Sequence, residues 1–276
     1  MQINPKTELN MLIGYPLEHT QSPILHKICY QQLGINAVLL AQPSLQLKSL
    51  IQAIKILSIR LTAVTSPYKE KVIKYLDQCS AEASQLQAVN TIIQRDGKLY
   101  GYNTDIDGIT FALRDIAING KQVLIIGAGG GARAMAYFLK KNHAKLFWIN
   151  RTPKAASTLA KKWGGHVIRD DQLRDLAIDI IVNTTPVGLY PHAHTSPLSN
   201  YLFHEKQVVF DMVYNPALTT LLKQAKKQGA KIISGLDMFT GQGLKQIELI
   251  TDQTFTPVMT CKLKKILIKN QQSMPP

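Results

Sequence analysis

The sequence predicts an α/β protein with two domains, and three observations support this prediction. Its 276 residues exceed a typical domain of roughly 150 residues. Short apolar runs, which are typical of buried strands, alternate with segments whose apolar residues recur at helical spacing. A glycine-rich turn in the second half, Gly127–Ala132, lies between such a run and such a segment. The alternation indicates sheets that are covered by helices.

The first domain is predicted from strands and helices that follow one another along the first hundred residues. Helical spacing at 109–118 and a turn at Asn119–Lys121 indicate a connection to a new strand, so we place the first domain at residues 1–105. Its expected strands are 11–13, 37–41 and 61–64, and its expected helices are 23–33, 45–57 and 70–76.

The second domain, residues 106–235, has the order of strands and helices that is typical of a doubly wound, Rossmann-type parallel sheet. Two helical segments after it, 236–250 and 257–268, have no strand left to pair with. We therefore expect residues 236–276 to return to the first domain and complete it. The expected strands of the second domain are 123–126, 146–149, 178–182 and 208–210, and its expected helices are 132–142 and 153–163.

Composition narrows the class of protein. The chain is 45% hydrophobic and 18% charged, has no run approaching ~20 apolar residues and has no signal-peptide pattern, so we expect a cytoplasmic protein without a membrane partner. Its net charge of +14 is spread along the chain, and the densest basic tract, 262–269, also carries the apolar spacing of a one-sided helix. We therefore expect no nucleic-acid partner. Cys29, Cys79 and Cys261 lie far apart, so the sequence predicts neither a disulfide nor a metal site.

The glycine-rich turn has the spacing Gly127-x-Gly129-x-x-Ala132, with a strand before it and a helix after it. Gly127 allows a tight turn, Gly129 lets a pyrophosphate approach the backbone, and Ala132 lets the helix pack closely on the strand. The free N–H groups at the start of the helix would bind the phosphates. This pattern predicts a dinucleotide site, the alternative being a plain glycine turn.

The residues after the next strand favour NADP over NAD. A protein that uses NAD is expected to carry an acidic residue here for the ribose hydroxyls. Asn150 instead removes the carboxylate that would repel a 2′-phosphate, and Arg151 offers a planar cation that pairs with it. The alternative is that Arg151 and Lys154 are solvated surface charges that bind no phosphate. The dipole of a helix opposes cations at its start, which disfavours this alternative.

Four polar clusters end apolar runs, and such ends line the ligand-binding crevice of an open α/β sheet. Reduction of a ketone needs a hydride donor and a group that manages the proton, for which Lys69 and Asp105 are candidates. The spacing does not establish that the two residues touch, and a lysine after "SPY" is ordinarily solvated. The clusters are 63–69, 87–91, 101–105 and 235–243.

In this order the clusters resemble those of the shikimate dehydrogenase family. Residues 14–27 resemble its G-x-P-x-x-H-S-x-S-P-x-x-H-N. Further matches follow along the chain as far as Gln242, to N-V-T-x-P-x-K, V-N-T, G-x-N-T-D, the glycine-rich turn, N-R-T, N-x-T-P-x-G, D-M-x-Y-x-P and G-x-x-M-x-x-x-Q. The resemblance implies a reversible, NADPH-dependent reduction of 3-dehydroshikimate to shikimate, on the route to chorismate and aromatic amino acids. It also implies a monomer or homodimer that acts on small molecules and uses no metal.

The resemblance assigns roles to particular residues. Lys69 and Asp105 match the catalytic pair that manages the proton, and the hydroxyls of Thr20 and Ser22 match a carboxylate clamp. His19 and His26 receive no catalytic role, and are interpreted as a strand-end cap and a hydrogen-bonded helix residue. The implied substrate-binding residues are Thr20, Ser22, Thr65, Lys69, Asn90, Asp105, Tyr214 and Gln242, and the implied cofactor-binding residues are Gly127, Gly129, Gly130, Gly131, Ala132, Asn150, Arg151, Thr152, Lys154, Asn183, Thr184, Met212 and Gly235. Two of these assignments have an alternative without a binding role: residues 183–185 would be an ordinary turn at the end of a strand, and Gln242 an ordinary helix residue.

Three residues depart from the family pattern. Thr20 stands where the family usually has serine, Ala63 replaces an asparagine and Lys27 replaces another. Thr20 lies in the carboxylate pocket that the resemblance implies and Ala63 lies near the substrate, so activity on quinate is an open question, whereas Lys27 is expected to face solvent. A quinate/shikimate dehydrogenase that uses NAD is the alternative enzyme, and Arg151 opposes it. A catalytically silent NADP-binding module is a further alternative, and the presence of both Lys69 and Asp105 opposes it.

Overall fold

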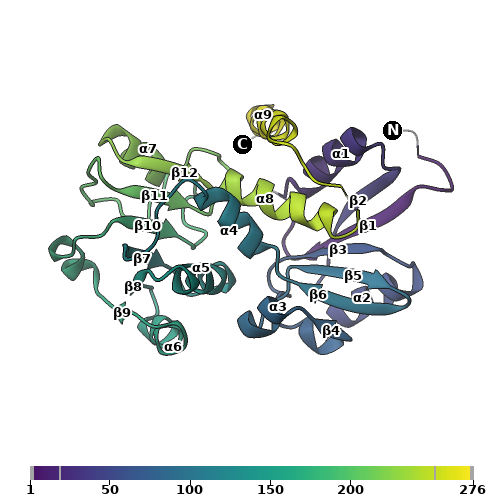
Figure 1. Ribbon diagram of the computed structural model, residues 1–276, viewed down its shortest axis with the longest axis horizontal. Coiled ribbons are helices and arrows are strands. Elements are labelled where there is room, and N and C mark those ends of the chain that lie inside the picture. The colour runs from purple at the N-terminus through teal and green to yellow at the C-terminus, as the bar shows by residue number, and fades with distance from the viewer. Residues whose placement is uncertain (1–2, 19, 252, 274–276) are drawn as a thin grey trace. The chain divides into compact units, whose positions relative to one another are not determined.

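The computed structural model describes residues 3–18, 20–251 and 253–273 (Figure 1). The chain divides into two compact units. The first contains the residues up to Asp107 together with Thr240–Asn270, and the second contains Gly108–Phe239. No helix among the described residues is long and apolar enough to cross a membrane.

The first unit is built on a mixed sheet of six strands in the order β2-β1-β3-β5-β6-β4. Strand β1 is parallel to β2 and β3, whereas β5 is antiparallel to both β3 and β6. A two-residue turn, Asp96–Gly97, joins β5 to β6, and both residues have positive φ, as this tight hairpin turn requires. The strands are β1 Glu8–Gly14, β2 Ala37–Pro43, β3 Leu61–Val64, β4 Gln78–Cys79, β5 Thr91–Arg95 and β6 Lys98–Tyr102.

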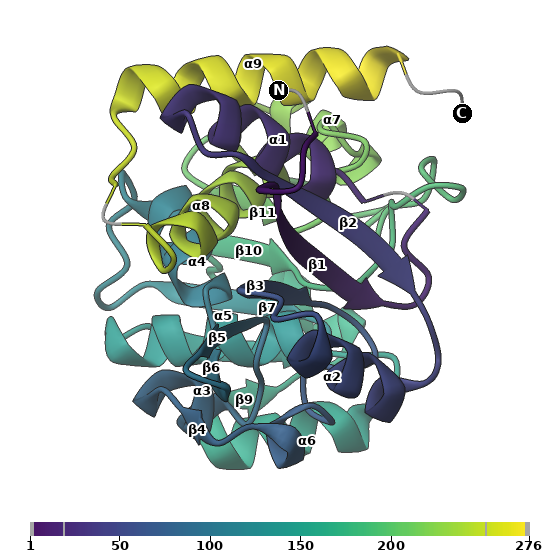
Figure 2. The ribbon, with the colours of Figure 1, turned by 90° about the vertical axis from the view of Figure 1, so that its right-hand side faces the viewer.

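Helices cover both faces of this sheet. Met11 and Ile13 of β1 join a core with the apolar face of α2, and Asn10 points to the opposite face, where its amide donates to Tyr30 of α1. Gly243 lets α8 approach α1 closely, because a side-chain carbon at this position would collide with Leu25. Helix α9 lies beside α1 in both views (Figures 1 and 2). The helices are α1 Ser22–Leu33, α2 Leu47–Ile56, η1 Ile73–Tyr75, α3 Ala81–Leu86, α4 Asp105–Leu113, α8 Gly235–Glu248 and α9 Pro257–Ser273, of which α4 and α8 continue into the second unit.

The second unit contains a sheet whose six strands are all parallel, in the order β9-β8-β7-β10-β11-β12. The chain starts in the middle at β7, runs outward to β9, and returns to the other side of β7 at β10. This is the strand order of a Rossmann fold, with the change of direction between β7 and β10. The elements are β7 Gln122–Ile126, α5 Gly130–Lys141, β8 Lys145–Ile149, α6 Pro153–Trp163, β9 His166–Val167, η2 Asp170–Asp175, β10 Ile180–Asn183, β11 Val208–Asp211, α7 Thr220–Lys227 and β12 Lys231–Ser234.

The α/β fold class, the Rossmann-type sheet and the return of the C-terminal helices to the first unit are confirmed. The helix expected at 70–76 is wrong. Short-range bonds such as Tyr75 N–H to the Val72 carbonyl make a turn and a 3₁₀ segment, after which Asp77 pairs with Leu99 of β6. Because Asp77 must pair with β6, the residues just before it cannot continue as a longer helix. The helix expected at 109–118 instead begins at Asp105 and ends at Leu113.

Candidate active site

The predicted substrate residues of the first unit follow or precede strands at one edge of its sheet. Since β5 runs opposite to β3 and β6, the start of β5 lies at the same edge as the ends of β1, β3 and β6. Four segments that are far apart in sequence therefore reach this edge. Thr20 and Ser22 follow β1, Thr65 and Lys69 follow β3, Asn90 precedes β5, and Asp105 follows β6.

Three of these side chains meet. The Lys69 ammonium lies 2.6 Å from Oδ2 of Asp105, and the Asn90 amide donates to the other carboxylate oxygen at 2.9 Å. The Lys69 side chain is 22% exposed and that of Asp105 is 8% exposed. The pair is therefore shielded from bulk water on the carboxylate side and accessible on the lysine side, which suits a group that exchanges a proton with a ligand.

The two motifs around Asn90 and Asp105 hold each other in place. The side-chain oxygen of Asn90 accepts the backbone N–H of Thr104 at 2.7 Å, and its side-chain NH₂ group also donates to the Thr104 hydroxyl at 3.0 Å. Asn103 donates from its amide to the Ala88 carbonyl and accepts the N–H of Asp105, which begins α4. These bonds tie the segment around Asn90 to the segment that leads into α4.

The two hydroxyls at the start of α1 lie together. Thr20 donates to the Ser22 hydroxyl at 3.3 Å and accepts the Ser22 backbone N–H at the same distance. Ser22 is the first residue of α1, where the partial positive charge of the helix start favours an anion. His19 lies outside the described residues. Thr65 follows β3 directly, and its backbone N–H donates to the Ile13 carbonyl.

Two predicted substrate residues come from other parts of the chain. Gln242 is half-buried in α8, one helical turn before Gln246. Tyr214 belongs to the second unit, where its ring stacks on Phe239 with 4.4 Å between ring centroids.

His26 is fully buried in α1 and bonds on both sides of its ring. Nδ1 lies 3.0 Å from the Tyr30 hydroxyl, and Nε2 lies 3.1 Å from the carbonyl oxygen of the Gln246 side chain. Burial lowers the pKa of His26 to about 4, against a smaller opposing effect of the Gln246 bond. The imidazole is therefore neutral at neutral pH.

This burial predicts an acid-sensitive first unit. Between the unfolded pKa of 6.5 and the folded pKa of about 4, the unfolded chain binds a proton at His26 that the folded unit does not. The free energy of unfolding should therefore fall as the pH falls through this window, by on the order of 3 kcal/mol. Urea unfolding at several pH values measures this slope. His26→Gln should abolish this contribution and His143→Gln, at a position outside the first unit, should retain it; an unchanged slope in His26→Gln would contradict the prediction.

The predicted cofactor residues of the second unit gather at the carboxyl edge of the parallel sheet, or at the helix starts that follow it. Ligands bind at this edge in Rossmann folds. Gly127 to Ala132 follow β7, Asn150 to Lys154 follow β8, Asn183 and Thr184 end or follow β10, Met212 follows β11, and Gly235 follows β12.

The glycine-rich turn has the shape that a pyrophosphate needs. Gly127 has φ of +110°, and a Cβ there would lie 2.5 Å from the Thr184 hydroxyl, so only glycine fits. Gly129 precedes α5 without a side-chain cap, and a Cβ there would meet no described atom within 4 Å. No described side chain caps the start of α5 and no described atom crowds Gly129, so the first N–H groups of the helix, which have no partner within it, suit a phosphate group. The residues fit a bound dinucleotide.

The segment after β8 presents a cation at the same edge. Asn150 donates from its amide to the Thr152 carbonyl at 2.9 Å, which tightens the turn before α6. The side chains of Arg151, Thr152 and Lys154 are exposed. An exposed guanidinium, with no carboxylate in the turn at 150–152, suits a phosphate ester better than a free ribose hydroxyl.

A buried carboxylate, which the sequence did not single out, supports the loop after β10. Asp211 accepts bonds from the Thr219 hydroxyl at 2.6 Å, the Val213 N–H at 3.0 Å and the Asn183 amide at 2.9 Å. The carbonyl oxygen of Asn183 in turn accepts the N–H and hydroxyl of Thr185. Burial raises the pKa of Asp211 to about 6, although all three bonds lower it.

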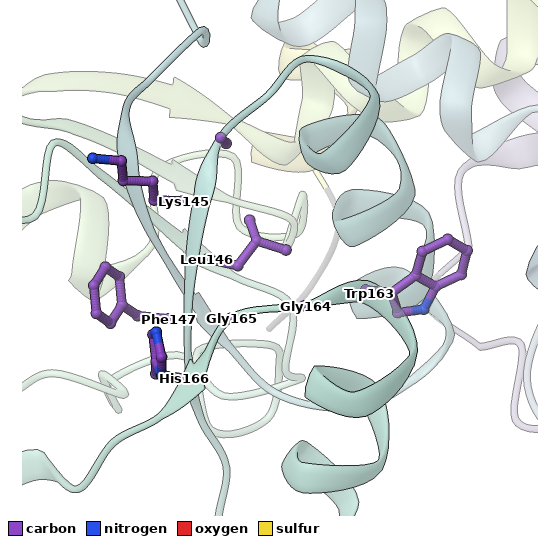
Figure 3. Close-up of a pocket in the computed structure, with 8 residues that line it drawn as sticks. Lys145, Leu146, Phe147, Trp163, Gly164, Gly165 and His166 are labelled. Atoms are coloured by element: carbon purple, nitrogen blue, oxygen red, sulfur yellow. The ribbon is translucent and has the colours of Figure 1, made fainter.

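A separate pocket of about 290 Å³ lies at β8 and β9 of the second unit (Figure 3). Phe147 and His166 lie on one side of Gly165, and Trp163 lies on the other. None of its lining residues is a predicted cofactor residue. The pocket is thus lined by residues other than those predicted for the dinucleotide.

The strand order, the glycine-rich turn and the polar sheet edges define an α/β protein of two units with a Rossmann-type dinucleotide-binding sheet. Residues 12–92 match the family described as "Shikimate dehydrogenase substrate binding domain", and residues 111–190 match "Shikimate / quinate 5-dehydrogenase". The chain belongs to the shikimate dehydrogenase family.

Similar proteins agree with this assignment. The chain is 40% identical to the shikimate dehydrogenase (NADP(+)) of Carboxydothermus hydrogenoformans, over 90% of this chain and 93% of that protein. It is 41% identical to the protein of the same name from Methanocaldococcus jannaschii, with the same coverage. The crystal structure of shikimate 5-dehydrogenase from Thermus thermophilus in complex with NADP(H) and shikimate matches with a TM-score of 0.86, at 32% identity over 94% of this chain and 99% of that one.

Proposed function

We propose that this chain catalyses the reversible, NADPH-dependent reduction of 3-dehydroshikimate to shikimate. The observation that carries the proposal is the contact of Lys69 with Asp105, which Asn90 braces, at the polar edge of the first sheet. The two relatives above carry the name shikimate dehydrogenase (NADP(+)), and the structure from Thermus thermophilus contains both ligands. Bound NADPH would supply the hydride.

The two units would bind different ligands. We propose that the predicted first domain, 1–105 with 236–276, binds the substrate, and that the predicted second domain, 106–235, binds NADPH. The match of residues 12–92 to a substrate-binding domain supports the first assignment. The glycine-rich turn before α5 supports the second.

Lys69 and Asp105 would manage the proton. In the direction of reduction, the Lys69 ammonium gives a proton to the ketone oxygen as the hydride arrives, and in the reverse direction its amine takes the proton from the hydroxyl. Asp105 holds the lysine in place and can accept a bond from a substrate hydroxyl. A lysine that faces water on one side can then exchange its proton with solvent.

The remaining predicted residues would bind the rest of the substrate. The hydroxyls of Thr20 and Ser22 would donate to the carboxylate, aided by the start of α1. The ring hydroxyls require donors and acceptors, which Thr65 and Gln242 would supply. Asn90 would bind a ring hydroxyl by exchanging its bond to the Thr104 hydroxyl for one to the substrate. Tyr214 of the second unit would lie beside the substrate. No step of this mechanism needs a metal.

We propose that Arg151 sets the preference for NADP. Arg151→Ala removes the cation that would pair with the 2′-phosphate, so the ratio of kcat/KM for NADP to that for NAD should fall by roughly 10- to 100-fold, since bonds to charged groups contribute about 1.5–3 kcal/mol. Lys140→Ala, which removes an exposed charge at the opposite end of α5, should leave the ratio unchanged. An equal ratio in both variants would refute the assignment.

We further propose a cytoplasmic enzyme that acts as a monomer or homodimer on small molecules, without nucleic acid or membrane partners. The support is the chemistry of the proposed reaction, whose substrate and cofactor are both small water-soluble anions. Size-exclusion chromatography with light scattering distinguishes the two assembly states.

The proposal is tested by crossing shikimate and quinate with NADP and NAD, while NADPH or NADH absorbance is followed. Reduction of NADP with shikimate, and little turnover of quinate, is the expected result. Comparable turnover of quinate with NAD would instead favour the quinate/shikimate dehydrogenase. Thr20 and Ala63, which depart from the family pattern, would then be the first residues to test as the cause of the quinate activity. No turnover with any pair would favour a silent NADP-binding module.

A further inference from the structure

A line of buried polar side chains crosses the first unit and ends at the Asp105 carboxylate. Nε2 of His26 lies 3.1 Å from the Gln246 side-chain oxygen, and the Gln246 amide donates to the Thr91 hydroxyl at 3.0 Å. Thr91 donates to the Asn90 side-chain oxygen at 2.9 Å, and Asn90 donates to Asp105. The three side chains between His26 and Asp105 are each at most 2% exposed. Water therefore cannot replace these bonds at low cost.

The partners determine the direction of every bond in this line. The Gln246 amide also lies 3.5 Å from the Asn90 backbone oxygen, which can only accept, so the NH₂ end of Gln246 must point toward β5. Its oxygen then faces His26 and requires a proton on Nε2. The Tyr30 hydroxyl receives a bond from Asn10, so it is free to donate its own proton to Nδ1 of His26.

This direction matters at Asn90, whose amide would lose its fit if it turned over. Its oxygen accepts from Thr91 and from the Thr104 N–H, and its NH₂ group donates to Asp105. Thr91 donates its one hydroxyl proton to this oxygen at 2.9 Å and accepts from Gln246, while the Thr104 hydroxyl lies farther away, at 3.3 Å. Removing the Thr91 hydroxyl takes away one of the bonds that keep the NH₂ group toward the carboxylate.

We propose that Thr91, supported by Gln246 and His26, is a positioning residue that holds the Asn90 amide against Asp105 and thereby orients the carboxylate toward Lys69. The role rests on the proposed function, since it acts on the pair assigned there to proton transfer. Thr91 itself is fully buried, in register with Ala63 of β3, and acts through Asn90.

The kinetic test uses three substitutions at threonines of adjacent strands. Thr91→Val keeps the shape and removes the hydroxyl, so kcat for shikimate oxidation should fall about 10-fold while the Kd for NADP stays within twofold. Thr91→Ser retains the hydroxyl and should recover most of kcat. Thr62→Val is the matched control, because Thr62 is equally buried in β3 and its hydroxyl has no hydrogen-bond partner among the described residues. It should leave kcat within twofold even if thermal stability changes.

The connection through Gln246 is tested by a double-mutant cycle. If both residues act through the same line, Thr91→Val with Gln246→Met should lower kcat no further than the more damaging single change. Multiplication of the two losses would contradict a shared line. Equal kcat in Thr91→Val, Thr91→Ser and Thr62→Val would overturn the positioning role. If Lys69→Ala were inactive in the same assay, the proposed function would still stand.

A measurement without turnover separates the two proposals. The side-chain NH₂ protons of Asn90, assigned by comparison with Asn90→Asp, should exchange slowly with solvent in the unaltered protein. Thr91→Val should accelerate their exchange at least 10-fold, and Thr62→Val should not. Unchanged exchange in Thr91→Val would overturn the positioning role. This result can be read even if the protein fails to oxidise shikimate, which would refute only the proposed function.

Discussion

Lys69→Ala is expected to lower kcat for shikimate oxidation by roughly two to four orders of magnitude, the range by which positioned general acids and bases accelerate reactions. The Kd for NADP should stay within twofold, because Lys69 belongs to the first unit and the glycine-rich turn belongs to the second. Stopped-flow turnover together with a fluorescence titration of NADPH measures both quantities.

Two further variants sharpen this test. Lys71→Ala removes an exposed lysine two residues away and should leave kcat within twofold. Lys69→Arg retains the positive charge beside Asp105, but a guanidinium does not give up its proton at accessible pH. Recovery of kcat by arginine would show that Lys69 supplies charge alone, and near-normal turnover of the alanine variant would remove it from the mechanism.

Asp211→Ala is expected to destabilise the second unit by on the order of 3 kcal/mol at neutral pH. The substitution leaves the Thr219 hydroxyl, the Val213 N–H and the Asn183 amide without their acceptor in a buried site. Chemical denaturation, with and without NADP, measures the loss. Asp175→Ala is a suitable control, since it removes an exposed carboxylate from the same unit.

Asp211→Asn should alter the pH dependence of this stability. The folded pKa of about 6 lies above the ordinary value of 3.8, so between these values the folded unit retains a proton that the unfolded chain has lost. The contribution of Asp211 to the free energy of unfolding is therefore greatest below pH 3.8. It declines as the pH rises through this window, by on the order of 3 kcal/mol. Asp211→Asn should lack this decline, and an identical pH slope in both proteins would contradict the assignment.

The fold was predictable where one clear apolar pattern marks an element. Strand β3 and helix α6 lie where strand and helical spacing place them, since the apolar positions there follow one clear pattern. The two-residue strands β4 and β9 are too short to carry a pattern. The segment at 70–76 has apolar residues at helical spacing, but its pairing with the sheet edge overrides local preference.

The candidate site was predictable only in part. Lys69 and Asp105 are 36 residues apart, and their contact depends on the reversal of β5, which the sequence pattern did not predict. Resemblance to a family identified them, whereas spacing alone left Lys69 as an ordinary surface lysine. Thr91, Gln246 and Asp211 were missed because their roles arise from bonds between distant segments. The spacing of four between Gln242 and Gln246, which places both on one helix face, was the available signal for one of them.

The hairpin turn Asp96–Gly97 offers a place to engineer this protein. Since β5 starts at the edge that carries Asn90, its far end and this turn lie at the opposite edge of the sheet. An inserted affinity tag or fluorescent reporter there would lengthen a two-residue connection at a modest entropic cost. The mixed direction of the strands thus provides an attachment point for immobilised or labelled protein, at the sheet edge remote from Lys69 and Asp105.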